Sequence, residues 1–129
     1  TGTGAGMPGG AGMRIYYSHP MHLDELAARY PTLTIIGCHP SVPWQDDMLA
    51  IAVHKKNVLL DLSGWSPRRF SPNLIAHVNG PLADKVMFGT DYPWLRPKRW
   101  LDAFAGLAIR DDVRPKVLRE NAVRLLGLG

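Results

Sequence analysis

Apolar residues follow two patterns along this chain, short continuous runs and longer stretches at helical spacing. The continuous runs have no polar alternation and predict strands buried on both faces: Leu33–Cys38, Val58–Leu62 and Val86–Phe88. The stretches at helical spacing predict helices over 21–29, 45–56, 72–78, 98–107 and 112–126, the last capped by Asp112. Repeated strand–helix units with apolar strands predict an α/β fold, a parallel sheet covered by helices.

Two polar residues follow predicted strands. His39 comes directly after the first strand, and Asp91 comes two residues after Gly89, where the third strand ends. Carboxyl ends of parallel strands meet at one edge of the sheet, and α/β enzymes place catalytic and metal-binding groups there. We therefore expect His39 and Asp91 to lie at the same edge of the sheet. The alternative is structural, because an aspartate before a Tyr-Pro pair is also a common turn former or helix cap.

The composition is that of a soluble globular domain. The 129 residues are 46% hydrophobic and 20% charged. No apolar run approaches the length of about 18 residues that a transmembrane helix needs, and no signal-peptide pattern is visible. The single cysteine, Cys38, lies in an apolar run, which predicts a buried, reduced and inert thiol in a cytoplasmic protein.

The net charge of +4 raises the question of nucleic-acid binding. The basic residues stand in small separate groups: Lys55–Lys56, Arg68–Arg69, and Arg96 with Lys98 and Arg99. Neither zinc-finger spacing nor the aromatic-rich strand of an RNA-binding sheet is present. A solvated basic surface is the better interpretation, with no nucleic-acid and no membrane partner.

The first 12 residues are rich in glycine, and Gly4–Gly9 satisfies the pattern G-x-G-x-x-G. A dinucleotide fingerprint requires a strand before this pattern, and Pro8 removes a backbone N–H that phosphate binding uses. A flexible loop or leader is the preferred interpretation. We therefore expect a glycine-rich segment over 1–12 and one domain of strand–helix units over 13–129.

Four segments carry a family resemblance: 30–39, 57–63, 86–93 and 117–127. In these segments the chain resembles the C-terminal portion of the amidohydrolase-related proteins. This group of metal-dependent (β/α)8 TIM barrels includes aminocarboxymuconate-semialdehyde decarboxylase. The resemblance implies that the three strands correspond to barrel strands six, seven and eight. Three strands are too few to close a barrel, so we expect the chain to be a C-terminal fragment.

The resemblance also implies roles for the two polar residues. Asp91 occupies the position of a metal ligand, and His39 occupies that of a histidine that polarises substrate or water and moves protons. The family's other ligands, an H-x-H pair and a histidine after strand five, have no counterpart here. The implied cofactor is a divalent metal ion, expected to be Zn²⁺. Since a catalytic zinc site needs three or more protein ligands, the fragment alone is expected to bind zinc weakly and to be inactive.

The loops after the three predicted strands hold candidate substrate-binding residues. Trp44, Trp65 and Trp94 could line an apolar or aromatic pocket, or simply pack the loops down. Arg68 could bind a substrate carboxylate. The remaining histidines are interpreted as structural or surface residues: His19, His22, His54 and His77.

These residues and the resemblance predict a metal-dependent hydrolase or non-oxidative decarboxylase. Its expected substrate is a small carboxylate or a compound derived from an aromatic ring. The alternative is a non-catalytic α/β binding or assembly module. The flanks of its sheet would then be covered by another chain or another copy, which makes a homo-oligomer possible.

Overall fold

The computed structural model describes residues 14–128, so the glycine-rich segment predicted over 1–12 lies outside the described residues. The sheet has three parallel strands, β1 (Ile35–Cys38), β2 (Val58–Asp61) and β3 (Val86–Met87), in the order β1-β2-β3. The predicted parallel sheet in sequence order is confirmed. Its register aligns Cys38 with Asp61 and Asp61 with Met87, so that these residues form one row across the sheet.

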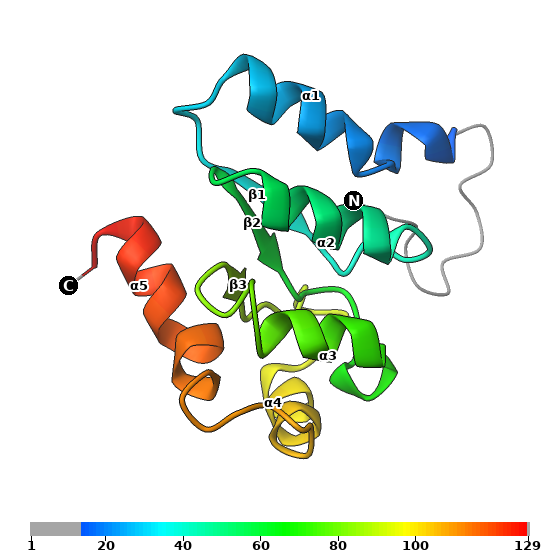
Figure 1. Cartoon of the computed structure of the whole chain (residues 1–129). Helices are drawn as coiled ribbons and strands as arrows, with labels where there is room; N and C mark the ends of the chain where they lie inside the picture. Colours follow the sequence, from blue (N-terminus) through cyan, green and yellow to red (C-terminus); the bar gives the residue numbers. More distant parts are fainter. Residues whose placement is uncertain (1–13, 129) are drawn as a thin grey trace.

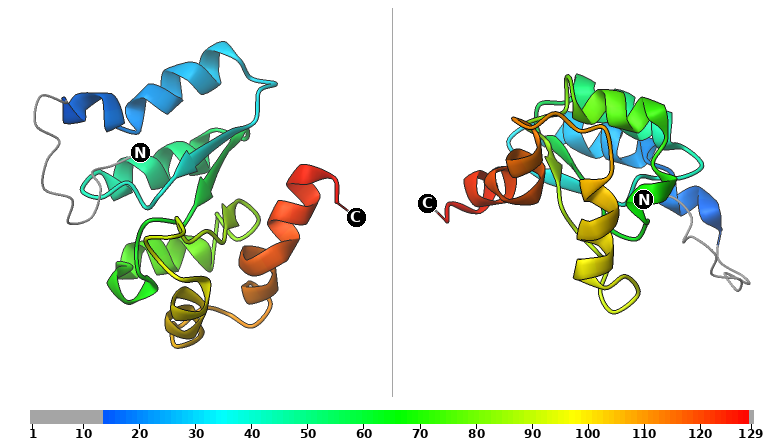
Figure 2. Two further views of the ribbon diagram at one scale, coloured as in Figure 1. Left: turned by 180° about the vertical axis from the view of Figure 1, so that it is seen from behind. Right: turned by 90° about the horizontal axis from the view of Figure 1, so that it is seen from below.

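Helices cover one face of this sheet. In Figure 1 and Figure 2, α1 (Met21–Arg29), α2 (Gln45–His54) and α3 (Pro72–Val78) lie side by side along that face. The other helical elements are η1 (Ile15–Ser18), η2 (Pro67–Arg69), α4 (Pro97–Ala105), the π-helical turn η3 (Lys116–Glu120) and α5 (Asn121–Leu126). Within residues 14–128, no helix has the length and apolar character needed to cross a membrane.

The helix boundaries follow local chemistry. Helix α3 begins where expected, because the Ser71 hydroxyl accepts a hydrogen bond from the Leu74 N–H at 3.1 Å. The predicted cap at Asp112 is wrong. Its carboxylate instead accepts two hydrogen bonds from the Arg110 guanidinium, at 2.9 and 2.7 Å, and the last helix begins at Arg114.

The core lies between the sheet and the helices. Val58, Leu60 and Leu62 alternate along β2 and its end, and each is at most 1% exposed. Helix α4 covers the end of the core that is lowest in Figure 1, and there the rings of Trp100 and Phe104 stack with their centres 4.9 Å apart. Burying these large side chains is the main source of stability in a domain of this size.

The opposite face of β1 is open. Ile36 is 42% exposed and Cys38 is also exposed, because alternate residues of a strand point to opposite faces. The predictions of a strand buried on both faces and of a buried thiol are therefore wrong for β1. Partial burial still raises the pKa of the Cys38 thiol, and the Asp61 carboxylate raises it further. A raised pKa favours the unreactive thiol form.

One buried amide anchors the last helix below β3. Asn121 is fully buried, and its side-chain nitrogen donates hydrogen bonds to the Ala83 carbonyl at 2.9 Å and the Val86 carbonyl at 2.8 Å. Both carbonyls lie where the chain enters β3. The side chain therefore satisfies backbone groups that the short strand leaves unpaired.

Two more side chains stabilise the same end of the sheet. Asn57, just before β2, donates to the Leu33 carbonyl at 2.9 Å. Lys85, just before β3, donates to the carbonyls of Ala52 and Lys55 at 2.5 and 2.6 Å, and burial lowers its pKa. We call this end, where the strands begin, the amino edge, and the end where they finish the carboxyl edge.

Candidate functional site at the carboxyl edge

His39 and Asp91 meet at the carboxyl edge of the sheet. His39 follows β1 and Asp91 follows β3, and the His39 Nε2 lies 4.0 Å from the Asp91 Oδ2. The prediction that both residues lie at the same edge of the sheet is confirmed. The distance is too long for a hydrogen bond, so the imidazole and the carboxylate face each other without a direct bond.

The end of β2 contributes residues that the sequence did not single out. The His39 Nδ1 and the Ser63 hydroxyl are hydrogen-bonded at 3.0 Å, and the Ser63 backbone N–H donates to the Asp61 Oδ1 at 2.7 Å. Ser63 is only 8% exposed. All three strands therefore contribute to one polar cluster, which consists of His39, Asp61, Ser63 and Asp91.

Two glycines make room for this cluster. Gly64 has a φ of +73°, and a Cβ there would lie 2.5 Å from the His39 Nδ1. A Cβ on Gly89 would collide with the Asp61 Oδ2. Since real Cβ atoms do not make such contacts, both positions require glycine. The His39 ring therefore packs against the backbone of Gly64, and the Asp61 carboxylate against that of Gly89.

The backbone at these strand ends is strained. In residues 14–128, the non-glycine residues with positive φ are His39 (70°), Ser41 (61°) and Asp91 (60°). The left-handed conformation costs an L-residue roughly 1–2 kcal/mol. Strained residues of this kind gather at functional sites, where the surrounding structure holds them in place. Here two of the three are the residues predicted to carry the chemistry.

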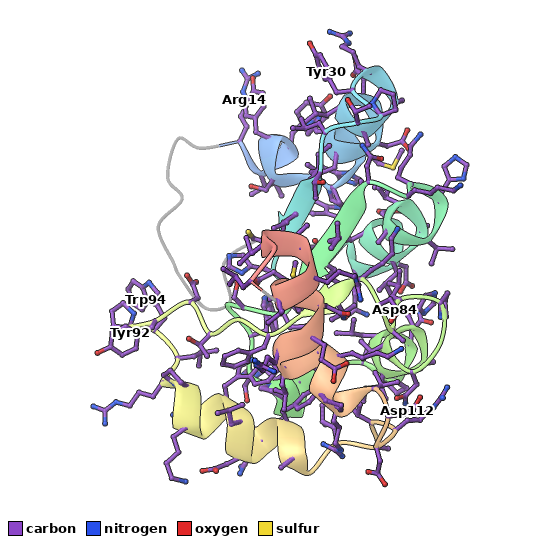
Figure 3. All side chains as sticks on the ribbon, turned by 90° about the vertical axis from the view of Figure 1, so that its left-hand side faces the viewer. Arg14, Tyr30, Asp84, Tyr92, Trp94 and Asp112 are labelled. Atoms are coloured by element: carbon purple, nitrogen blue, oxygen red, sulfur yellow. The ribbon has the colours of Figure 1, made fainter. Side chains whose placement is uncertain are left out.

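The predicted aromatic residues lie in the expected loops but do not surround His39 and Asp91. The ring of Trp44 packs against His19 at 4.7 Å, and the Arg69 guanidinium lies 6.0 Å from the ring centre of Trp65. Trp94 is 71% exposed and projects from the molecule, as Figure 3 shows. The Trp94 backbone N–H donates to the Asp91 carbonyl at 2.9 Å. Within the described residues, however, no ring contact joins the three indole side chains to the polar cluster.

Arg68 lines a different part of the same loops. It borders a hollow of about 340 Å³ together with residues from the start of α4, Arg96, Lys98, Arg99 and Asp102. None of Trp44, Trp65 and Trp94 is among the residues that line this hollow.

Three of the other histidines have local partners. The His22 Nε2 lies 3.0 Å from the Tyr16 carbonyl, and the His77 Nδ1 lies 2.9 Å from the Asn73 carbonyl. The His19 Nε2 lies 3.7 Å from a carboxylate oxygen of Asp47. These contacts agree with the structural interpretation of these side chains.

The donors at the carboxyl edge make part of a metal site and not a whole one. An imidazole and carboxylates are donors that zinc accepts, but a zinc site needs three or more ligands around one point. In residues 14–128, no group of three or more His, Cys, Asp or Glu side chains could hold a metal ion. Asp91 and His39 alone do not fit a complete site.

Comparison with known proteins identifies the family. A family model described as Amidohydrolase matches residues 1–128. The chain belongs to the amidohydrolase family. Members of this family are in general hydrolases or lyases that bind divalent metal ions. No curated protein matches the chain.

A solved structure supports the fold. An uncharacterized TIM-barrel protein from Bordetella bronchiseptica, Bb4693, is similar with a TM-score of 0.83 and 32% identity over 92% of this chain. The match covers 43% of that protein, so the amidohydrolase chain described here spans less than half of its length. The parallel layer is therefore part of a TIM barrel, as predicted. Its numbering as strands six to eight and the decarboxylase-like subtype stay predictions.

Proposed function

We propose that this chain contributes one side of the active site of a metal-dependent hydrolase or non-oxidative decarboxylase. The substrate would be a small carboxylate or a compound derived from an aromatic ring. The observation that carries the proposal is the pair of His39 and Asp91, which face each other at 4.0 Å across the carboxyl edge. Active sites of TIM-barrel enzymes lie at this edge.

In this proposal His39 transfers a proton through its Nε2 atom. The Nδ1 atom is held by the Ser63 hydroxyl at 3.0 Å, and a hydroxyl can either donate or accept a hydrogen bond. His39 therefore keeps its bond to Ser63 in either tautomer, while Nε2, on the side of Asp91, gains or loses a proton. Asp61 holds Ser63 in place through the serine backbone, so it acts as a positioning residue.

Asp91 would supply one anionic oxygen to a divalent metal ion. Its side chain is 46% exposed, so the carboxylate is accessible from the carboxyl edge. When bound, a metal ion of this kind polarises a substrate oxygen and makes hydroxide available near neutral pH. The remaining ligands would have to come from outside the polar cluster, because the described donors are too few.

The test uses a protein that contains the complete barrel. A panel of small aromatic and unsaturated carboxylates, esters and lactones is assayed for carbon dioxide release and for hydrolysis products, and metal content is measured after dialysis. Asp91→Ala should lower metal content and turnover together. The matched control is Asp111→Ala, since Asp111 is a fully exposed aspartate outside the cluster. If Asp91→Ala kept full metal and full turnover, Asp91 would not be a ligand.

One observation favours the alternative of a non-catalytic assembly module. The open face of β1 exposes the apolar side chain of Ile36 (42%), and Leu33 (48%) is exposed in the turn just before this strand, so another chain could cover them. Sedimentation of the chain and of Ile36→Lys would test this. Self-association that Ile36→Lys abolishes, together with no turnover and no bound metal in the complete barrel, would favour the module over the enzyme.

A further inference from the structure

A basic hollow lies beside the site, between the loop after β2 and the start of α4. Its volume is about 340 Å³, and its lining comprises four basic side chains and one acidic: Arg68, Arg96, Lys98, Arg99 and Asp102. Arg68 belongs to η2 and the other four residues to α4 or the residue just before it. The fold thus joins two small basic groups that are well separated in the sequence.

Most of the positive charge in this hollow is not neutralised by the protein. The Lys98 ammonium binds the Asp102 carboxylate at 2.7 Å, which accounts for one charge of each sign. Four cations and one carboxylate leave an excess of three positive charges. Within residues 14–128, the guanidinium groups of Arg68, Arg96 and Arg99 form no ion pair or hydrogen bond. Like charges gathered around one hollow repel each other, and a bound anion would relieve that repulsion.

The start of α4 adds to the same imbalance. The first turn of this helix contains no acidic residue and two cations, Lys98 and Arg99, and Arg96 at the cap position makes no side-chain capping bond. Acidic side chains normally occupy the first turn, because the helix dipole is positive there. Among the described residues, only Lys98 of these cations has an acidic partner, Asp102, and departures from a local rule of this kind often occur at functional positions.

We propose that this hollow binds a multiply charged oxyanion, a phosphate or polycarboxylate group of a small molecule. Guanidinium groups present paired N–H donors that match the oxygens of such groups. The volume of about 340 Å³ lies within the roughly 300–1,000 Å³ that small-molecule pockets occupy. The charges gather around one hollow and not along a stripe, which favours a small ligand over a nucleic acid.

This binding site does not depend on the metal chemistry proposed above. The loops that form it follow β2 and β3, so its ligand would approach from the carboxyl edge. Because the anion is held by arginine side chains, its binding can be measured directly without a metal and without turnover. Failure of the enzymatic proposal would therefore leave this inference untouched, and the reverse also holds.

The experiment is calorimetric titration of the protein with inorganic phosphate, with malonate and with chloride at matched ionic strength. Phosphate, malonate or both should bind saturably, and chloride should not. The anion that binds identifies the group as phosphate or carboxylate. In the double variant Arg96→Gln/Arg99→Gln, binding should weaken by roughly tenfold for each guanidinium removed.

Two further variants keep the test decisive. Arg119→Gln removes an equivalent charge from an exposed residue of η3 and should bind the anion as the unmodified protein does. Arg68→Gln changes a separate element and should weaken binding even if the double variant fails to fold. The proposal is wrong if neither phosphate nor malonate binds, or if these substitutions weaken binding no more than Arg119→Gln. Binding of a short DNA duplex without binding of either small anion would also overturn it.

Discussion

The two edges of the sheet are built in opposite ways. At the amino edge, the side chains of Asn57, Lys85 and Asn121 donate hydrogen bonds to backbone carbonyls. At the carboxyl edge, His39 and Asp91 have left-handed backbones, and their side chains face each other without a bond. At the amino edge the side chains are used up in hydrogen bonds to the backbone. At the carboxyl edge the facing atoms of His39 and Asp91 can still bind a ligand.

This contrast assigns different roles to the two edges, stability to the amino edge and chemistry to the carboxyl edge. Buried, saturated hydrogen bonds stabilise the fold, whereas strained and partly exposed groups lower stability and are retained at sites that do chemistry. In TIM barrels the face at the beginning of the strands serves stability and the opposite face carries the active site. Substitutions at the two edges should therefore affect different measurements.

The largest effect is expected for His39→Ala in a protein with the complete barrel. Loss of the proton-transfer group should reduce turnover by roughly 10²–10⁴-fold. Metal content and the unfolding midpoint should change little, since His39 contributes no core packing. Turnover, metal analysis and denaturant unfolding are the measurements. If the variant lost its metal, His39 would be a ligand and the proton-transfer group would have to lie elsewhere.

At the amino edge, Asn121→Ala should lower stability most. The change removes two hydrogen bonds from a fully buried amide and leaves the Ala83 and Val86 carbonyls unpaired. The expected loss is about 2–4 kcal/mol in the free energy of unfolding, measured by urea denaturation of the chain. Arg119→Ala, on the exposed side of the preceding turn, is the control and should change little. A loss for Asn121→Ala no larger than that of the control would remove the basis for separating the two edges.

Ser63→Ala sharpens the comparison because Ser63 is buried like an amino-edge residue but lies at the carboxyl edge. Without the hydroxyl, the His39 Nδ1 loses its partner and the ring is less well oriented. Turnover should fall by roughly tenfold, the equivalent of one hydrogen bond. Ser63→Thr keeps the hydroxyl and should restore part of the loss. Equal turnover in Ser63→Ala and the unmodified protein would exclude an orienting role.

The smallest effect concerns the ion pair of Asp84 and Lys116, 2.8 Å apart, in which the Asp84 side chain is 62% exposed and that of Lys116 is 32% exposed. The hydrogen bond from Lys116 lowers the pKa of Asp84 below its usual 3.8. A carboxyl whose pKa is lowered by folding contributes stability above its unfolded pKa and loses it as the pH falls through the folded pKa. Asp84→Asn should therefore cost less than about 1 kcal/mol at neutral pH and nothing in strong acid. Urea denaturation at both pH values measures this difference, and an equal cost in acid would contradict it.

Much of the fold could be predicted from the sequence. The strands and helices follow from hydrophobic spacing, and helices 21–29 and 72–78 have the predicted bounds. The exposed face of β1 could not be predicted. The continuous apolar run Leu33–Cys38 is typical of a strand buried on both faces, as strands of a complete barrel are. The start of the last helix was also missed. Asp112 is a good capping residue by type, but the nearby Arg110 takes its carboxylate.

The site was predictable only in part. The position of His39 and Asp91 at one edge follows from parallel strands, but their close approach across β2 does not. Asp61 and Ser63 were missed, although a signal existed. They are two polar residues at alternate positions at the end of an apolar strand, which places both on the face opposite Leu60 and Leu62. Whether they contact His39 depends on the register between β1 and β2, which the sequence does not specify.

The exposed position of Cys38 offers a chemical reporter of barrel assembly. In a closed barrel the inward-facing residues fill a packed interior, and Cys38 shares its row with Asp61 and Met87. The thiol should be open to alkylation in this chain and protected once the remaining strands cover that face. The rate of labelling at this single cysteine would thus measure closure of the barrel without an assay of its chemistry.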